Sequence, residues 1–257
     1  QELILEFHQR LAQAISPGPD VDPAGGLPHL LEAARIAREL EDWERYVGWA
    51  GGAGGMYDAL GRTEEAREAL QRNLEFAQNL GHRGSEVTAH IQLAHFHRRH
   101  GNHDAAIRHY RTALKLEEES RDQTLFMSLL RELGGVYHAQ GNAAEALRCY
   151  EESRRRAADT SHRWHEAAAL RNMGIVHADL GDYFRALELS LESVRILRDN
   201  GFAHVAGAGV GNVGLIYQAL GDYSNARKSF VESYQSALRY HDIGEQERLL
   251  GDLGDLS

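Results

Sequence analysis

The stretch LRELGGVYHAQGNAAEALRCYEES, residues 130–153, carries the pattern that decides the fold. Its first half repeats small and apolar residues at the spacing of one helix face. These residues are Leu130, Leu133, Gly134 and Tyr137. Gly141 then ends the helix, because glycine readily adopts the left-handed backbone of a helix cap. In a second helix the small Ala146 allows close approach and Tyr150 packs one turn later, so the stretch predicts an antiparallel helix hairpin.

This pattern recurs five times at intervals of 40 residues. The capping glycines are Gly61, Gly101, Gly141, Gly181 and Gly221. The alanines five residues later are Ala66, Ala106, Ala146, Ala186 and Ala226. The ring-bearing residues four before each glycine are Tyr57, His97, Tyr137, His177 and Tyr217. One hairpin cannot bury both of its faces, so neighbouring hairpins must stack into a continuous array.

The repeated unit resembles a tetratricopeptide repeat, as residues 130–153 and NVGLIYQALGDYSNARKSFVES (212–233) show. The match covers roughly residues 43–240. The usual tetratricopeptide repeat has about 34 residues, so this chain is similar to the long-repeat subgroup of kinesin light chains, spindle-orientation adaptors and bacterial regulators. The resemblance implies an all-α, right-handed superhelical solenoid of antiparallel helix hairpins.

We expect three regions along the chain. Residues 1–42 form a degenerate hairpin with a helix over 2–15 and a loop rich in proline and glycine over 16–27. Five repeats follow at 43–82, 83–122, 123–162, 163–202 and 203–240. Residues 241–257 repeat the apolar spacing once more, which predicts the first helix of a truncated further repeat.

The charge balance argues against two classes of partner. The chain has 28 basic and 38 acidic residues and a net charge of −10. Nucleic acids and anionic membranes attract a basic excess, so we expect neither as a partner. No run of about 18 apolar residues occurs that would span a membrane. Cys149 is the single cysteine, which favours a reducing, cytoplasmic location.

Several sequence signals resemble chemistry but have a structural explanation. Residues 209–214, GVGNVG, match the dinucleotide-binding pattern but fall inside a predicted helix with no strand before it. Fifteen histidines include His97, which occupies a position that is tyrosine in three other repeats, and no metal-binding His-Glu-x-x-His motif occurs. No nucleophile with a base and an orienting group is evident. We therefore expect no cofactor, no metal and no enzymatic activity.

The inner groove of such a solenoid is lined by the first helix of each repeat, on the stripe opposite the core. The candidate ligand-binding residues on this stripe are Gln92, His95, Arg98, Arg99, Arg131, His138, Arg171, Asn172, Asn212 and Gln218. Guanidinium groups offer planar, paired donors, so we expect a protein or peptide ligand that is acidic, phosphorylated or extended. The resemblance implies that Asn172 and Asn212 hydrogen-bond a bound peptide backbone, with Gln92 as a substitute.

The sequence is compatible with two further functions. The chain could be the sensory module of a larger bacterial regulator that binds a small peptide or metabolite, with an effector domain beyond Ser257. It could also be a self-assembly module. In that case an exposed apolar end at Leu249, Leu250 and Leu253 would pair with a second copy.

Overall fold

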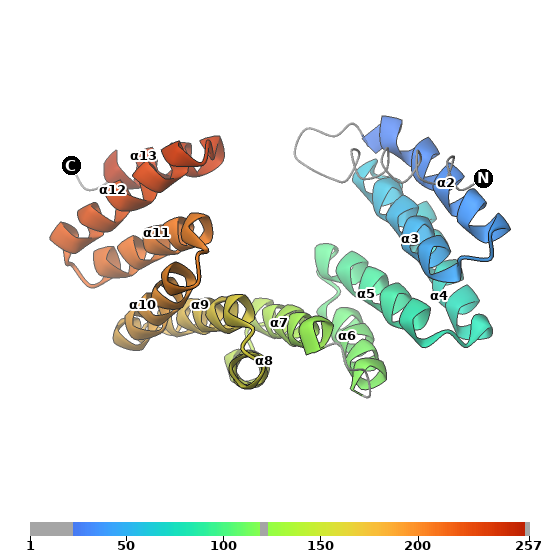
Figure 1. Cartoon of the computed structure of the whole chain (residues 1–257), viewed down its shortest axis with the longest axis horizontal. Coiled ribbons are helices and arrows are strands. Elements are labelled where there is room, and N and C mark those ends of the chain that lie inside the picture. Colours follow the sequence, from blue (N-terminus) through green and yellow to red (C-terminus); the bar gives the residue numbers. More distant parts are fainter. Residues whose placement is uncertain (1–22, 119–122, 255–257) are drawn as a thin grey trace. The chain divides into compact units, whose positions relative to one another are not determined.

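The computed structural model describes residues 23–118 and 123–254. Every regular element in these two ranges is an α-helix (Figure 1). The expected helix over 2–15 lies outside the described residues. The prediction of an all-α array of helix hairpins is confirmed.

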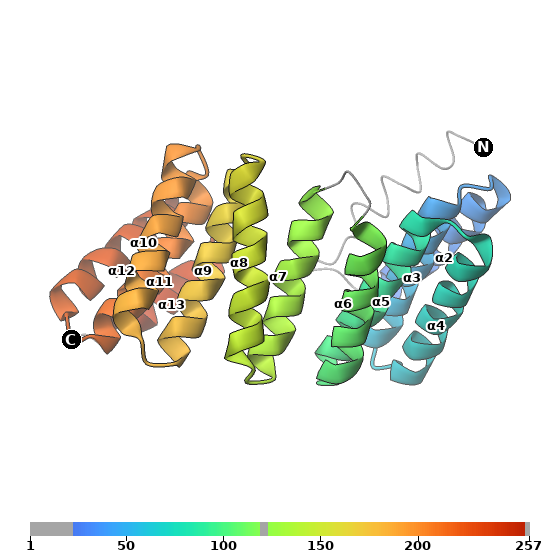
Figure 2. The ribbon, with the colours of Figure 1, turned by 90° about the horizontal axis from the view of Figure 1, so that it is seen from below.

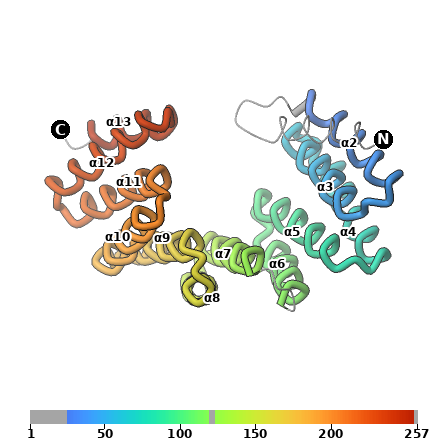
Figure 3. The backbone as a smooth tube through the Cα atoms, in the orientation of Figure 1, coloured from blue at the N-terminus to red at the C-terminus, as the bar shows by residue number. Residues whose placement is uncertain are grey.

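The helices fall into two alternating sets whose starts are 20 residues apart. The first helices of the hairpins are α3 (Trp43–Ala59), α5 (Arg83–Arg99), α7 (Gln123–Ala139), α9 (Arg163–Asp179), α11 (Ala203–Ala219) and α13 (Ile243–Gly254). The second helices are α2 (Pro23–Glu39), α4 (Thr63–Leu80), α6 (His103–Glu117), α8 (Ala143–Asp159), α10 (Tyr183–Asp199) and α12 (Tyr223–Arg239). The backbone tube in Figure 3 shows the tight reversal between consecutive helices within each hairpin.

The chain divides into two compact units, residues 1–121 and residues 122–257. Unit 1 contains α2–α6 and unit 2 contains α7–α13. Within unit 1, α3 packs against α2, α4 and α5. Within unit 2, α9 packs against α7, α8 and α10. Figure 2 shows the helices of each unit lying side by side, so each unit is a stack of hairpins.

Left-handed residues end both kinds of helix. The five glycines that follow the first helices have φ between +70° and +80°, as the cap requires. Five of the second helices also end beside a left-handed residue, and the equivalent position after α6 lies outside the described residues. Gly81 and Gly201 serve there, but the same position holds Glu41, Ser161 and His241, with φ of 56°, 60° and 58°.

Small residues inside each hairpin make room for large ones. The five repeated alanines are all 0% exposed, which confirms their predicted place between the two helices. A Cβ on Gly134 would lie 2.6 Å from the Tyr150 ring, and one on Gly214 would lie 2.6 Å from the Phe230 ring. Glycine at this column therefore allows a buried ring to pack on the opposite helix backbone.

The N-terminal loop prediction is wrong for residues 23–27, which form the start of α2. Pro23 is tolerated because the first helical residue needs no backbone donor. Leu27 and Leu30 pack against Ala53 and Met56 of α3, and this apolar burial favours the helix. Residues 16–22 lie outside the described part of the chain.

The predicted apolar end at α13 is wrong for Leu249, which is 0% exposed. Leu249 packs against Ala226 and Phe230, and Leu253 lies against the same cluster. Leu250 is 55% exposed. Across the described residues, none of the helices combines the length and apolar character needed to cross a bilayer.

Candidate functional site

Unit 2 brings together two arginines from neighbouring first helices. Arg131 on α7 and Arg171 on α9 occupy the same position of consecutive repeats, and both are half-buried. Burial, followed by the positive charge of Arg131, lowers the pKa of Arg171. Arg171 makes no hydrogen bond or ion pair with any residue that the structure describes. The two guanidinium groups therefore form a cationic pair, Arg131–Arg171, in which Arg171 has no anionic partner among the described residues and Arg131 has the Glu132 carboxylate at 4.0 Å.

Arg131 is held in place mainly by an aromatic side chain. Its guanidinium carbon lies 5.0 Å from the centre of the Trp164 ring, within range of a cation–π interaction. The nearest carboxylate oxygen, on Glu132, is 4.0 Å from Nη2, too far for a hydrogen bond. The Nη1 atom is buried without a hydrogen-bond partner among the described residues. Arg131 thus keeps donors that a bound anion could use.

Tyr150 lies within the electrostatic reach of both arginines. Burial above all, with Cys149 and Glu132, raises its pKa to about 12 against the opposing effect of Arg131 and Arg171. The phenol therefore stays protonated at neutral pH.

A cavity of about 240 Å³ adjoins Arg171, between α9, α10 and α11. Its lining residues are Arg171, Ile175, Ala178, Asp179, Tyr183, Ser190, Asn212, Leu215, Ile216 and Ala219. Pockets for drug-sized ligands have roughly 300–1,000 Å³. This smaller cavity has the size of one large side chain, and its lining combines apolar residues with the charged Arg171 and Asp179.

The other predicted site residues of unit 2 lie on the same series of helices. His138 on α7 contacts Asp179 on α9, with 2.8 Å between Nε2 and Oδ2. Asn172 and Gln218 are half-buried on α9 and α11. Asn212 lines the cavity together with Arg171. The structure therefore groups Arg131, Arg171 and Asn212, and places His138 in a contact between repeats.

In unit 1 the predicted residue Gln92 fills a gap between helices. Its Nε2 lies 3.3 Å from the carbonyl oxygen of Val47, and its Oε1 accepts a 2.9 Å hydrogen bond from Asn73. A Cβ on Gly51 would lie only 1.9 Å from this side chain. Gln92 therefore joins α3, α4 and α5, and its amide is already hydrogen-bonded.

The predicted Arg99 of unit 1 is also paired. Its Nε donates a 2.8 Å hydrogen bond to Asp58, whose carboxylate also lies 2.7 Å from Nε2 of His100. The Asp58 side chain is 9% exposed, whereas that of Arg99 is 48% exposed. His95 packs its ring 5.9 Å from that of Tyr110, and Arg98 is exposed. The first helices of unit 1 thus carry basic residues, and the charge of one of them, Arg99, is neutralised by Asp58 of the same unit.

Sequence reasoning missed a set of hydrogen bonds that fixes the first helices. Ser153 and Ser193 donate to the carbonyls of Met127 and Ala167, at 3.1 and 2.7 Å. Asn73 donates to the carbonyl of Val47 at 3.0 Å. In each of these three bonds the polar donor lies 26 residues after the acceptor carbonyl. A polar residue recurring at this place in the second helices could have revealed the bonds from the sequence.

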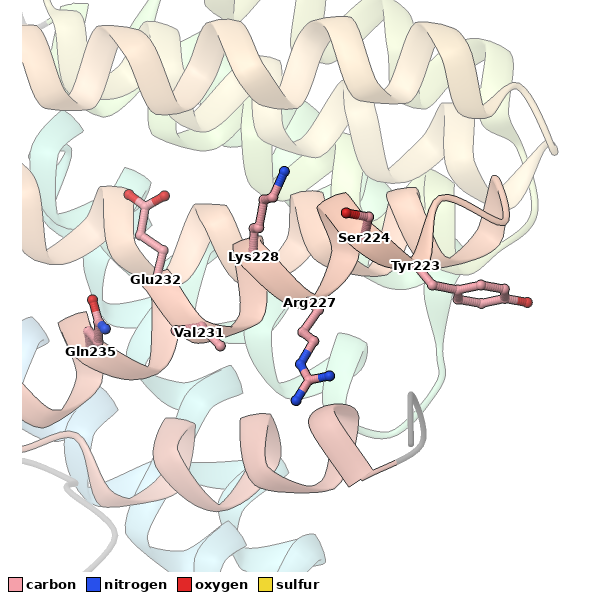
Figure 4. A pocket seen from close by; sticks show the side chains of 7 residues that line it. All are labelled: Tyr223, Ser224, Arg227, Lys228, Val231, Glu232 and Gln235. Carbon is pink, nitrogen blue, oxygen red and sulfur yellow. The ribbon is translucent and has the colours of Figure 1, made fainter.

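Other candidate sites are weaker. The GVGNVG motif lies inside α11, away from any helix start. Among the described residues, no three histidine, cysteine, aspartate or glutamate side chains are grouped to hold a metal ion. A hollow along α12 is lined by residues of that helix alone, and in Figure 4 Arg227 and Lys228 point away from one another. These side chains do not converge on one ligand position.

Comparisons with known proteins agree with the repeat architecture. A family model described as tetratricopeptide repeat matches residues 48–119 and 125–199, and another of the same description matches 210–238. A search of curated proteins finds no match to the chain.

Three solved structures have similar folds. BtubC (BKLC) from P. vanneervenii is 17% identical with a TM-score of 0.75, over 86% of this chain and 93% of that one. Kinesin light chain repeats from Podosopora anserina are 18% identical with a TM-score of 0.63, over 75% and 95%. A Rap protein complexed with Competence and Sporulation Factor is 17% identical with a TM-score of 0.63, over 99% and 70%. The family models together match more than half of the sequence, and the chain belongs to the tetratricopeptide repeat family.

Proposed function

We propose that the chain is a non-catalytic module that binds a protein or peptide segment on the first-helix face of unit 2. The Arg131–Arg171 pair is the observation that carries this proposal. Two half-buried guanidinium groups lie close enough for one to lower the pKa of the other, and Arg171 has no described partner. A buried charge without a partner is costly, so an anion placed between the two arginines would bind favourably.

The chemistry of the pair indicates the kind of segment. Guanidinium groups form paired hydrogen bonds with carboxylates and phosphates. The Asn212 side chain can both donate to and accept from a peptide backbone, because an amide carries both functions. The adjoining cavity has room for an apolar side chain. We therefore propose a segment that places an acidic or phosphorylated residue at Arg131 and Arg171, bound in the cytoplasm.

A second candidate function is supported by one of the structural neighbours. The Rap protein was solved in complex with Competence and Sporulation Factor, and the present chain covers 70% of its length. A sensory module of a larger regulator would use the same face for a small signalling ligand. Self-assembly through the exposed Leu250 is a third candidate, for which a mass that rises with protein concentration would be the evidence.

The proposal is tested by selecting ligands from a random peptide display library with the wild-type chain. Dissociation constants of the selected peptides are then measured for the R131E/R171E variant and for R155E/R185E. Arg155 and Arg185 are exposed and pair with Glu152 and Glu188, so the control changes net charge equally. We expect a loss of affinity of about a hundredfold for R131E/R171E, typical of losing buried charge contacts.

Each other outcome contradicts the proposal in a specific way. Equal losses in both double variants would mean that net charge alone governs binding. Full affinity in R131E/R171E would place the binding site elsewhere on the chain. An empty selection would count against peptide binding altogether.

A further inference from the structure

The hairpin of α5 and α6 in unit 1 has histidines in its core where other repeats have different residues. His90 corresponds to Ala50, Leu130, Leu170 and Val210. His109 corresponds to Ala69, Cys149, Leu189 and Ser229. His97 corresponds to Tyr57, Tyr137, His177 and Tyr217. This one hairpin therefore places three titratable rings at positions that are otherwise mostly apolar or aromatic.

The three rings are in direct contact, and we call them the histidine cluster. The Nδ1 atoms of His90 and His109 are 2.9 Å apart, so a single proton lies between them. The rings of His97 and His109 are stacked, with centroids 5.5 Å apart and planes 9° from parallel. His90 is 6% exposed. Its Nε2 and the Nδ1 of His97 are buried without a hydrogen-bond partner among described residues.

The surroundings of the cluster oppose additional positive charge. Arg108 on α6, Arg67 on α4 and His100 on α5 act against protonation of His97. On α5, Glu86 favours protonation of His90, but its Oε1 is 3.9 Å away from Nε2.

Asp58, an acidic residue of α3, contacts Arg99 and His100. Burial is the main cause that lowers the pKa of all three cluster histidines, and the pKa of His109 falls to about 4.

We propose that the histidine cluster is a pH-sensitive switch, in which protonation loosens the packing of α6 against α5. Each additional proton gives one ring a positive charge. Because the rings touch one another, charging two or three of them would place like charges within a few ångströms. The helix α5 also carries His95, Arg98 and Arg99, so loosening would displace these candidate groove residues. The switch itself does not depend on the proposed function.

The direction of the effect follows from proton binding. In the opened hairpin a histidine has its ordinary pKa near 6.5. In the packed hairpin the pKa of His109 is about 4. At any pH between about 4 and 6.5, the open form therefore binds more protons than the packed form. Falling pH therefore favours opening in this window, and the packing is stable above it.

The test is hydrogen exchange of the full chain at pH 7.5 and pH 5.0, corrected for the intrinsic rate. Residues 83–117 report on the switch, and residues 163–199, which form the hairpin of α9 and α10, serve as the internal reference. We expect exchange in 83–117 to rise at least about tenfold relative to the reference, since one pKa unit corresponds to a factor of ten.

The double variant H90L/H109L should remove this response, because leucine also occupies the equivalent positions 170 and 189. The control H204L replaces an exposed histidine outside the cluster and should leave the response unchanged. An equal rise in both hairpins, or a response that persists in H90L/H109L, would overturn the proposal.

A measurement on the wild-type chain keeps the proposal testable if the double variant does not fold. Ring carbon chemical shifts report the protonation of each histidine by NMR. The switch requires the His109 ring to stay neutral at pH 6 and the cluster rings to titrate together with loss of protection in 83–117. Ordinary titration near pH 6.5 with the hairpin still protected would refute it.

Discussion

The two units use the same repeat but differ in how the arginines of their first helices are partnered. In unit 1, the position that holds Arg131 and Arg171 in unit 2 is Gly51 in one repeat, and Gln92 of the next helix fills the gap. The exposed Arg99 of unit 1 pairs with the nearly buried Asp58. In unit 2, Arg131 and Arg171 lie near each other and Arg171 has no described partner.

This difference shows what a repeat position determines. The position of a residue within the repeat determines where its side chain lies on the helix. The residue on the neighbouring helix decides whether its charge is neutralised, as Asp58 does for Arg99. An inner-face arginine is therefore a binding candidate only after its neighbour is known.

The largest expected effect tests whether the two units share one packing scheme. Ala146 in unit 2 and Ala106 in unit 1 are both 0% exposed between paired helices. Replacing either with phenylalanine should lower the free energy of unfolding by about 3 kcal/mol through overpacking. Urea denaturation measures the loss, and A144F, at an exposed position of α8, is the control. A loss in only one unit would mean that the units are not packed alike.

Most of the fold could be predicted because the repeat spacing is redundant. Five glycines and five alanines at one interval specify the hairpins, and the structure places them as caps and contact points. The exception is residues 23–27, where Pro23, Gly25 and Gly26 suggested a loop. A single stretch without a repeat partner offers only local propensity, and the burial of Leu27 overrides it.

The candidate site was predictable only in outline. The spacing places Arg131 and Arg171 at equivalent positions, and the structure shows that their helices, α7 and α9, contact each other. The hydrogen bond between Gln92 and Asn73 joins side chains 19 residues apart, and the contact of His138 with Asp179 joins side chains 41 residues apart. Such pairing depends on side-chain conformation, so spacing alone could not reveal which polar groups were already satisfied.

The second prediction uses the contrast between the arginines directly. R171M should raise the free energy of unfolding of the unliganded chain by about 1 kcal/mol, because it removes a half-buried charge without a partner. R99M should lower it by about 1 kcal/mol, because the Asp58 carboxylate loses one of its two partners.

Thermal and urea unfolding of both variants give the sign of each change. R155M, at an exposed arginine with an adjacent glutamate, should change stability by less than either. A loss of stability in R171M would mean that Arg171 is satisfied within the unliganded chain, and the contrast between the units would disappear.

The smallest expected effect concerns the ends of the second helices, where both units depart from glycine. Glu41 in unit 1 and Ser161 in unit 2 have φ of 56° and 60°, in the left-handed region. This conformation costs a residue with a side chain about 1 kcal/mol, while glycine loses about 0.5 kcal/mol more chain entropy on folding. E41G and S161G should therefore each stabilise the chain by about 0.5 kcal/mol.

The two gains should add in the double variant, because the sites share no partner. D159G, at the last residue of α8, should instead destabilise the chain, since its backbone is helical. Urea midpoints that fall in S161G would show that contacts of the Ser161 side chain outweigh the strain of its backbone.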